Sequence, residues 1–255
     1  MKNNDNFIKD FWDNQAEIHK ESYKASWGDI NAISLEIQAI SEYLADDQIV
    51  LDAGCGNGYS TFLQSISYDF KKIIGVDFSE SMIKFTKDKE YSDIEFKVGN
   101  ILNLDFKDDY FDVAYTTRTL INLPTWEQQI QAFNELYRVT KPGGKILLSE
   151  AFWEPLCKLN SLRLILGLDP LVEHDFNRYL KKEKFEKLLK DKNLFFINNN
   201  FSSVYYFGSR LLRELLTKEF IDYKNPINDL FFELSQKFTA KNDIGIQQLY
   251  VIWKK

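Results

Sequence analysis

Residues 49–58, with the sequence IVLDAGCGNG, decide the fold of this chain. A short apolar run ends at an acidic residue, Asp52, and a loop with three alternating glycines follows. This order is typical of a buried strand, a tight turn and a helix N-terminus in a doubly wound α/β sheet. Glycines allow backbone angles that other residues avoid, and they let a ligand approach the main chain closely. The segment therefore predicts a ligand-binding turn.

Further apolar runs alternate with amphipathic segments along the chain. We expect strands at 72–77, 94–98, 110–115, 145–150, 195–207 and 246–253. Helical patterns cover 5–24, 29–44, 125–139, 159–168, 181–189, 209–220 and 226–238, with Asp29 and Ser79 as helix caps. Lys141-Pro142-Gly143-Gly144 is a stop and turn signal. Strands that alternate with helices predict a parallel sheet covered on both faces.

Composition excludes several classes of protein. The chain has 255 residues and a net charge of -6, which argues against an extended nucleic-acid-binding face. No apolar run approaches the roughly 20 residues that span a bilayer, and the first residues lack the apolar core of a signal peptide. Cys55 and Cys157 are the two cysteines, too few for a disulfide framework or a metal cluster. We expect a cytoplasmic protein without metal, nucleic-acid partner or membrane span.

The glycine spacing indicates which ligand the loop binds. A nicotinamide enzyme would show G-x-G-x-x-G, whereas here Gly54, Gly56 and Gly58 alternate. Asp52 would repel a pyrophosphate, but it suits a cationic ligand such as S-adenosylmethionine, which carries an ammonium and a sulfonium. Asp77, at the end of the next strand, is placed to accept hydrogen bonds from ribose hydroxyls.

Over about residues 45–152 the sequence resembles the class I S-adenosylmethionine-dependent methyltransferases. The resemblance rests on residues 51–58, 75–79 with Met82, 99–100, 111–113 and 138–144. It implies a Rossmann-like doubly wound α/β sheet of seven strands. The sixth strand would be 195–207, and the seventh, 246–253, would run antiparallel. The domain would carry an N-terminal helical cap and helical insertions after strands five and six.

The resemblance also assigns cofactor contacts. Gly54 and Gly56 would approach the methionine part, with Asp52 supporting the loop, and Asp77 would hold the ribose. Asn100 stands where an acid often contacts the adenine amino group; its amide oxygen can still accept that bond. The full set of implied cofactor residues is Trp27, Asp52, Gly54, Cys55, Gly56, Asp77, Phe78, Met82, Asn100, Ile101 and Thr116. Thr116 would face the methyl end. Core packing is the alternative for the apolar members Phe78, Met82 and Ile101, and anchoring of a lid helix for Tyr23 and Trp27.

Ligands of open parallel sheets bind beyond the carboxyl ends of the strands. We therefore divide a single domain, 1–255, into a cap (1–45), a cofactor-binding core (46–151) and two acceptor-binding lids (152–180 and 202–240). Arginines gather in the segments expected around the acceptor, and guanidinium is the preferred partner of carboxylate and phosphate. The candidate acceptor-binding residues are Tyr23, Arg118, Arg163, Arg178, Tyr179, Tyr206 and Arg210. Pairing with a surface acid is the alternative for each arginine.

A hydroxyl acceptor benefits from a base, and His174 is the candidate, with a solvated surface histidine as the alternative. Arg118, directly after the fourth strand, is the second catalytic candidate, and His19 is expected at the surface.

The leading hypothesis is O-methylation of a small anionic metabolite, such as a sugar, a nucleotide-linked or a phosphorylated precursor, with S-adenosylhomocysteine as the product. The C-terminal pattern is similar to that of stand-alone methyltransferases of bacterial surface-polysaccharide (capsule) biosynthesis. The alternatives are an N-methyltransferase on an amino sugar or other amine, a dehydrogenase, and a non-catalytic cofactor-binding protein. A nucleic-acid methyltransferase is disfavoured because residues 116–119, TTRT, lack an Asn-Pro-Pro-Tyr-like motif. A monomer or homodimer is expected.

Overall fold

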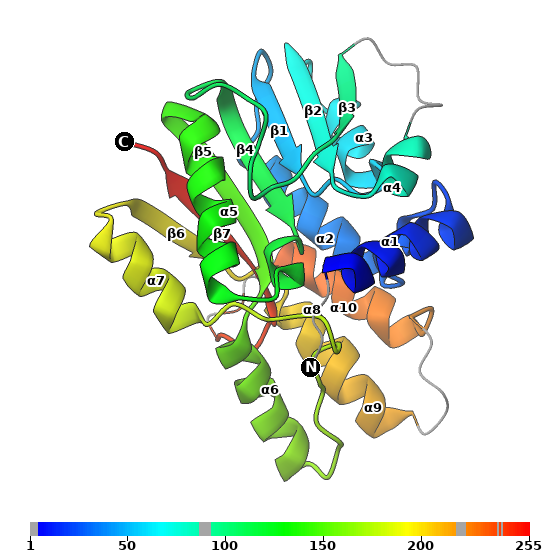
Figure 1. Ribbon diagram of the computed structural model, residues 1–255. Coiled ribbons are helices and arrows are strands. Elements are labelled where there is room, and N and C mark those ends of the chain that lie inside the picture. The colour runs from blue at the N-terminus through cyan, green and yellow to red at the C-terminus, as the bar shows by residue number, and fades with distance from the viewer. Residues whose placement is uncertain (1–4, 87–92, 218–222, 239, 241) are drawn as a thin grey trace.

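A seven-stranded mixed sheet forms the centre of the computed structural model (Figure 1), which describes residues 5–86, 93–217, 223–238, 240 and 242–255. The strand order is β3-β2-β1-β4-β5-β7-β6. The strands are β1 (Ile49–Ala53), β2 (Lys72–Asp77), β3 (Ile94–Val98), β4 (Phe111–Thr117), β5 (Thr140–Ala151), β6 (Phe195–Asn199) and β7 (Gln247–Trp253). Only β7 runs against its neighbours, pairing antiparallel with both β5 and β6. The expected Rossmann-like sheet with an antiparallel last strand is confirmed.

Alternate residues of the strands build two cores, one on each face of the sheet. Leu51, Ala114 and Ile146 pack beneath α5 (Trp126–Val139) and α7 (Lys182–Asp191). Their sequence neighbours on the opposite face pack against α2 (Ile30–Ser41). Figure 1 shows α5 and α2 on opposite sides of the sheet. Both faces are therefore closed, and a ligand can approach only at an end of the strands.

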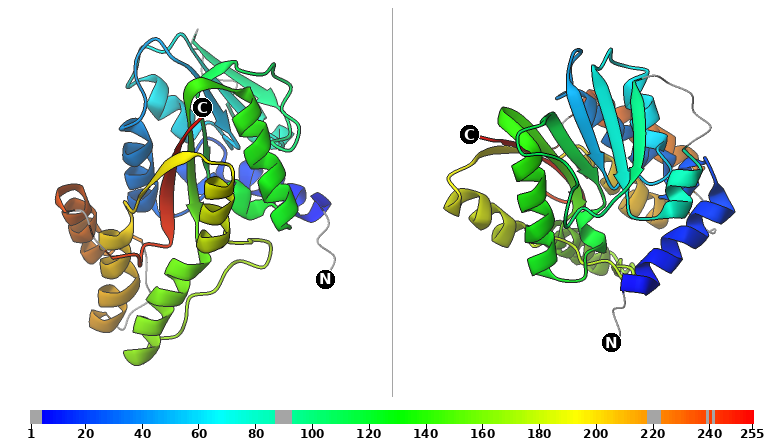
Figure 2. Two further views of the ribbon diagram at one scale, coloured as in Figure 1. Left: turned by 90° about the vertical axis from the view of Figure 1, so that its left-hand side faces the viewer. Right: turned by 45° about the horizontal axis from the view of Figure 1, so that its top comes forward.

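Helices gather beyond the carboxyl ends of the strands. They are α1 (Asp5–His19), α6 (Trp153–Ile165), α8 (Ser203–Phe207), the π-helical segment η3 (Gly208–Leu212) and α9 (Arg213–Leu216). The views in Figures 1 and 2 agree that α6 and α9 project away from the sheet. The remaining elements are η1 (Tyr23–Ala25), α3 (Tyr59–Ser65), α4 (Glu80–Lys84), η2 (Leu120–Asn122) and α10 (Pro226–Lys237). Among the described residues, no helix combines the length and apolarity needed to cross a bilayer.

Two helix caps lie where the sequence predicts them. The Asp29 carboxylate accepts a hydrogen bond from the backbone N–H of Ala32 (3.2 Å) at the start of α2, and the Ser79 hydroxyl accepts one from that of Met82 (3.0 Å) at the start of α4. Such caps satisfy N–H groups that the first helical turn leaves free.

Two local expectations are wrong. The segment 195–207 is a strand only as far as Asn199, and residues 203–207 form helix α8. Tyr205 and Tyr206 are both buried in this helix, so tertiary packing overrides their preference for a strand. The turn at 141–144 lies inside β5 as a bulge, where Gly143 (φ 77°) donates a hydrogen bond to the carbonyl of Lys254. Residues 218–220 of the expected helix 209–220 lie outside the described part of the chain, and the expected helix 226–238 is α10.

Candidate active site

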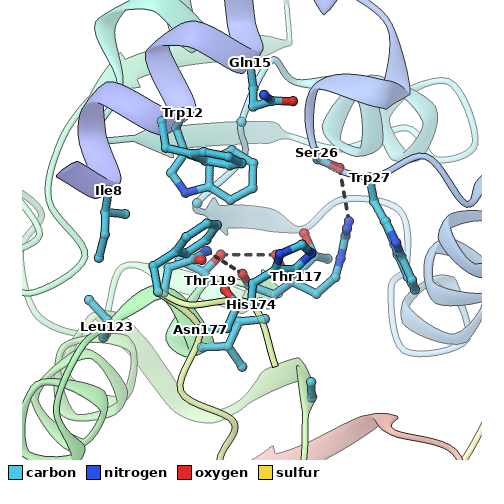
Figure 3. A pocket seen from close by; sticks show the side chains of 18 of the residues that line it. Ile8, Trp12, Gln15, Ser26, Trp27, Thr117, Thr119, Leu123, His174 and Asn177 are labelled. Atoms are coloured by element: carbon cyan, nitrogen blue, oxygen red, sulfur yellow. Dashed lines mark hydrogen bonds between the residues drawn. The ribbon is translucent and has the colours of Figure 1, made fainter. Parts of the chain in front are cut away.

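A cavity of about 470 Å³ opens beyond the carboxyl ends of β1, β2 and β4. The glycine loop forms its floor, α1 covers one side, and the segment after α6 covers another. Figure 3 shows Ile8, Trp12 and Gln15 of α1 across the cavity from Leu123 and Asn177. The site is thus enclosed by elements that lie far apart in the sequence.

The glycine loop has the backbone geometry that its sequence indicates. Gly54, Gly56 and Gly58 have φ values of 84°, 54° and 74°, in the left-handed region that favours glycine. A Cβ on Gly54 would overlap the Thr119 side chain, whereas a Cβ on Gly56 would meet only the Met82 sulfur, 4.0 Å away. Gly56 therefore presents bare main chain to the cavity, as a cofactor cradle requires.

Asp77 connects this loop to the next strand. Its Oδ2 accepts a hydrogen bond from the Gly56 N–H (2.9 Å), and its Oδ1 accepts one from the Ser79 N–H (2.9 Å). The residue lines the cavity, and burial raises the pKa of its carboxyl to about 6. Each oxygen keeps a further acceptor site, which suits the two hydroxyls of a ribose.

Asp52 lies beneath the loop and does not line the cavity. Its Oδ2 accepts hydrogen bonds from the hydroxyls of Thr61 (2.7 Å) and Tyr115 (2.9 Å). Its Oδ1 has no hydrogen-bond partner among the described residues. Burial, together with the nearby charges of Asp77 and Glu36, raises the pKa of the carboxyl to about 7. The geometry gives Asp52 a supporting position, without direct contact with the cavity.

The residues assigned to adenine, Phe78, Met82, Asn100 and Ile101, all line the cavity, as does Cys55. The Asn100 Oδ1 already accepts a hydrogen bond from the backbone N–H of Leu102 (2.9 Å), so one of its two acceptor positions is occupied.

Helix α1 and the residues just after it are held over the cavity by hydrogen bonds that were not predicted from the sequence. The Ser79 hydroxyl donates to Asp13 (2.5 Å), and the Asn57 amide donates to the carbonyls of Lys20 (2.7 Å) and Ser22 (2.9 Å). Trp12 and Phe11 line the cavity, and the Phe11 ring lies 4.6 Å, centroid to centroid, from that of Phe176 in the opposite lid. The aromatic residues of 5–24 gave a signal for a buried face, but not for a ligand site.

Arg118 lines the cavity beside Trp27, as expected. Its guanidinium lies 5.2 Å from the Trp27 ring centroid, and its Nε donates to the buried carboxylate of Glu36 (3.2 Å). Its Nη2 donates to the Ser26 hydroxyl (3.3 Å), the bond drawn at Ser26 in Figure 3. Arg118 also has a positive φ of 54°, so its backbone holds a conformation that non-glycine residues rarely adopt.

The structure places two expected ligand contacts elsewhere. The Thr116 hydroxyl is buried and donates to Glu150 (2.9 Å), while Thr117 and Thr119 line the cavity in its place. Tyr23 packs against Tyr59 at 5.9 Å between ring centroids, and only Tyr59 lines the cavity. Strand alternation explains the first case, because Thr116 and Thr117 point to opposite faces.

Arg163 and Arg178, two of the expected acceptor-binding residues, lie outside the cavity lining. Arg163 is buried outside the cavity lining, and donates to the carbonyl of Asp169 (2.7 Å) and the carboxylate of Glu214 (2.7 Å). The Arg178 guanidinium donates to the carbonyls of Asp175 (3.0 Å) and Asn177 (2.6 Å) in its own loop. Each guanidinium thus forms its hydrogen bonds to other groups of the protein, and neither arginine lines the cavity.

The remaining candidates, His174, Tyr179, Tyr206 and Arg210, all line the cavity. The His174 ring is exposed at the cavity edge and stacks on that of Phe176, 5.9 Å away between centroids. Burial raises the pKa of the Tyr179 phenol to about 12, so it is a neutral hydrogen-bond donor.

Three amide side chains line the cavity although the sequence did not predict them: Asn122, Gln128 and Asn177. The side-chain oxygen of each is buried without a hydrogen-bond partner among the described residues. Amides occur throughout this chain, so no sequence pattern singles out these three. Within the same described residues, no group of three His, Cys, Asp or Glu side chains is arranged to hold a metal ion.

Residues 50–144 match a family described as methyltransferase domain. A tRNA (carboxymethyluridine(34)-5-O)-methyltransferase of Arabidopsis thaliana is 34% identical over 114 residues, which are 45% of this chain and 26% of the relative. A demethylmenaquinone methyltransferase of Lactococcus lactis is 38% identical over 106 residues, 40% of this chain and 41% of the relative. The chain thus spans less than half the length of these curated relatives.

Solved structures share the fold over a longer part of the chain. The phosphoethanolamine N-methyltransferase 2 of Haemonchus contortus, in complex with phosphomonomethylethanolamine and S-adenosylhomocysteine, superposes with a TM-score of 0.58. The sequence identity is 14%, and the superposition covers 97% of this chain and 60% of that one. The likeness therefore extends beyond residues 50–144 to the cap and the lids.

Proposed function

We propose that this chain, whose residues 50–144 form a methyltransferase domain of the class I S-adenosylmethionine-dependent type, methylates a hydroxyl of a small anionic metabolite. The observation that carries the proposal is the continuity of one cavity. Its lining includes a cofactor cradle at Gly56 and Asp77 together with two arginines, Arg118 and Arg210. A methyl donor and an anionic acceptor can therefore occupy the same enclosed space.

The described residues fit S-adenosylmethionine. The bare main chain at Gly56 admits the methionine part, Asp77 offers acceptors for ribose hydroxyls, and Met82 and Ile101 offer apolar faces to adenine. When bound, the cofactor supplies a methyl group activated by its sulfonium. The chain contributes alignment of the acceptor and exclusion of water, which account for much of the rate of an in-line displacement.

His174 is the group that can accept the proton of a hydroxyl acceptor. It lies at the cavity edge, where an imidazole can reach both the acceptor and solvent. Arg118 is held by Glu36 and Trp27, so its role is to position the acceptor and close the site.

N-methylation of a small amine is the second candidate, and a specific observation favours it. The unpartnered amide oxygens of Asn122, Gln128 and Asn177 can accept hydrogen bonds from an amine. The neutral acceptors suit an amine better than a carboxylate would, because methylation requires the unprotonated nitrogen. The phosphorylated amine in the Haemonchus contortus complex combines both features, an anionic group and a nitrogen.

The test is an S-adenosylhomocysteine-release assay across nucleotide sugars, phosphorylated metabolites including phosphoethanolamine, free polyols and amines. Precursors of surface polysaccharides belong in this panel because they combine hydroxyls with phosphate. NMR of the product then identifies the methylated atom. We expect turnover with anionic acceptors and none with the matching neutral compounds.

Variants of the two histidines test the base. His174→Gln is expected to lower turnover of a hydroxyl acceptor at least tenfold with unchanged affinity for S-adenosylmethionine. His19→Gln is the matched control, because His19 lies in the last turn of α1 and does not line the cavity. Equal turnover of the two variants would remove His174 from the mechanism.

Calorimetry separates the remaining classes. Binding of NADH without binding of S-adenosylmethionine would contradict the proposal in favour of a dehydrogenase. Tight cofactor binding with no product on any acceptor would indicate a non-catalytic binding protein.

A further inference from the structure

Three buried arginines lie in three helical segments beyond the sheet: Arg163 in α6, Arg210 in η3 and Arg213 in α9. Two carboxylates face them. Asp29 pairs with Arg210 (2.5 Å), and Glu214 pairs with Arg163 (2.7 Å) and more distantly with Arg213 (3.7 Å). Within the described residues one positive charge of this cluster therefore lacks a counter-charge. A buried charge without a partner is costly, so a further anion beside these arginines would be favourable.

Arg210 is the member of the cluster that reaches the cavity. It is 8% exposed, its Nη2 donates to Asp29, and its Nη1 has no hydrogen-bond partner among the described residues. Asp29 is itself fixed, because it caps α2 and accepts the hydroxyl of Tyr205 (2.7 Å). The guanidinium is thus held in a constant position.

Tyrosines surround this guanidinium on the cavity side. Its central carbon lies 5.2 Å from the ring centroid of Tyr206 and 5.4 Å from that of Tyr223. Both residues line the cavity, as does Tyr179. No hydrogen bond of these three phenol hydroxyls is present within the described residues, so each can donate to a ligand. Guanidinium and phenol groups in one pocket are the donors that bind phosphate or carboxylate oxygens.

Negative charge is scarce along the described cavity lining. Asp77 is its one carboxylate, and both oxygens of Asp77 accept backbone N–H groups at the cofactor end. The Arg210 end therefore has no acid of the lining in competition with a bound anion.

We propose that Arg210, with Tyr179, Tyr206 and Tyr223, is the subsite that binds the anionic group of the acceptor, a phosphate monoester or a carboxylate. The proposal rests on the proposed function, since it names the part of that cavity which selects the acceptor. The acceptor then lies with its charged end at Arg210 and its methylated atom toward the glycine loop.

The test is calorimetric titration of the purified chain at constant ionic strength, with and without S-adenosylhomocysteine. Inorganic phosphate and benzoate are the probes for the two kinds of anion, and benzyl alcohol is the neutral control. We expect one of the anions to bind and benzyl alcohol not to bind. Arg210→Gln is expected to lower the affinity for the anion tenfold to a hundredfold and to leave the affinity for S-adenosylhomocysteine unchanged.

Two further variants keep the test valid if Arg210→Gln fails to fold. Arg210→Lys retains the charge beside Asp29 but loses the second donor edge, and Tyr206→Phe removes one hydroxyl without changing the charge. Each of these two variants is expected to lower the affinity for the anion severalfold. Arg178→Gln is the matched control and is expected to bind the anion like the wild type, because Arg178 does not line the cavity.

Absence of binding of both anions, or equal binding by the wild type and the Arg210 and Tyr206 variants, would overturn the subsite. The titration without S-adenosylhomocysteine gives this answer independently of the cofactor. Failure of S-adenosylhomocysteine to bind, with anion binding intact, would instead contradict the proposed function alone.

Discussion

Glu36 in α2 and Arg118 after β4 are 82 residues apart in the sequence, yet the Glu36 Oε2 lies 3.2 Å from the Arg118 Nε. The other oxygen of Glu36 accepts the Ser149 hydroxyl (2.5 Å) and the Gln247 amide (2.8 Å). One carboxylate that is 1% exposed therefore joins α2, β5, β7 and the loop that carries Arg118. The cavity wall depends on this junction.

Glu36→Gln is expected to lower the free energy of unfolding by about 3 kcal/mol, because the Arg118 charge loses its partner and an amide donor faces other donors. Urea denaturation measures the change. Glu233→Gln, on the exposed side of α10, is the control and should change stability by less than about 0.5 kcal/mol. Equal effects of the two substitutions would show that the junction contributes nothing.

Asp52 predicts a pH dependence of stability. Burial raises the pKa of its carboxyl from the usual 3.8 to about 7 in the folded chain. The neutral form is therefore favoured by folding, and this contribution is complete below about pH 4 and lost as the pH rises through 7. Asp52→Asn, which is neutral at every pH, should raise the thermal midpoint at pH 8 but not at pH 4.

Scanning calorimetry at the two pH values checks this expectation, and Asp46→Asn at the exposed end of the α2–β1 connection is the control. An identical shift at pH 4 and pH 8 would mean that Asp52 is not the titrating group.

Gly54 and Gly56 predict opposite consequences of the same substitution. Gly54→Ala should destabilise the fold, because its Cβ would collide with Thr119. Gly56→Ala should cost only the about 1–2 kcal/mol of a left-handed alanine, but its methyl group would occupy cofactor space. We expect Gly56→Ala to remain folded and to bind S-adenosylhomocysteine at least tenfold more weakly. Unchanged affinity would show that the cofactor does not bind against Gly56.

Substitution of Arg163 should lower the stability of the protein more than substitution of Arg178. Neither substitution should change cofactor binding. Arg163→Met leaves Glu214 and the carbonyl of Asp169 without their buried partner, so we expect a loss of about 3 kcal/mol. Arg178→Met should lose less than about 1 kcal/mol, because its bonds lie within one partly exposed loop. Denaturation curves distinguish the two, and similar losses would contradict the structural assignment of Arg163.

The features that sequence could predict are local. Apolar runs located most of the strands, Asp29 and Ser79 marked two helix starts, and the glycine spacing located the loop that forms the cavity floor. The features that the sequence did not predict depend on contacts between residues that are far apart in the chain. Arg163 and Arg210 are the same residue type in the sequence. In the structure, however, Arg210 lines the cavity, whereas Arg163 forms an ion pair with Glu214.

The helical cap shows the same limit. Trp12 could be assigned to a buried face from its periodicity, yet its place at the cavity follows from ties such as Asn57 to Lys20, 37 residues apart. Likewise, Ser202 and the residues after it continue the alternation of β6 but leave the sheet, because the Tyr205 hydroxyl donates to Asp29, the N-cap of α2.

The position of β7 bears on how the chain assembles during synthesis. Because β7 lies between β5 and β6, the ribosome releases β6 well before the strand that joins it to the sheet. Until then β6 has no partner in the sheet, and the lid elements α8 to α10 emerge in the interval. Such long-range pairing is slow because its loop must close first. We therefore expect the part of the cavity wall built by the segments after β6 to form after the part built by β1, β2 and β4.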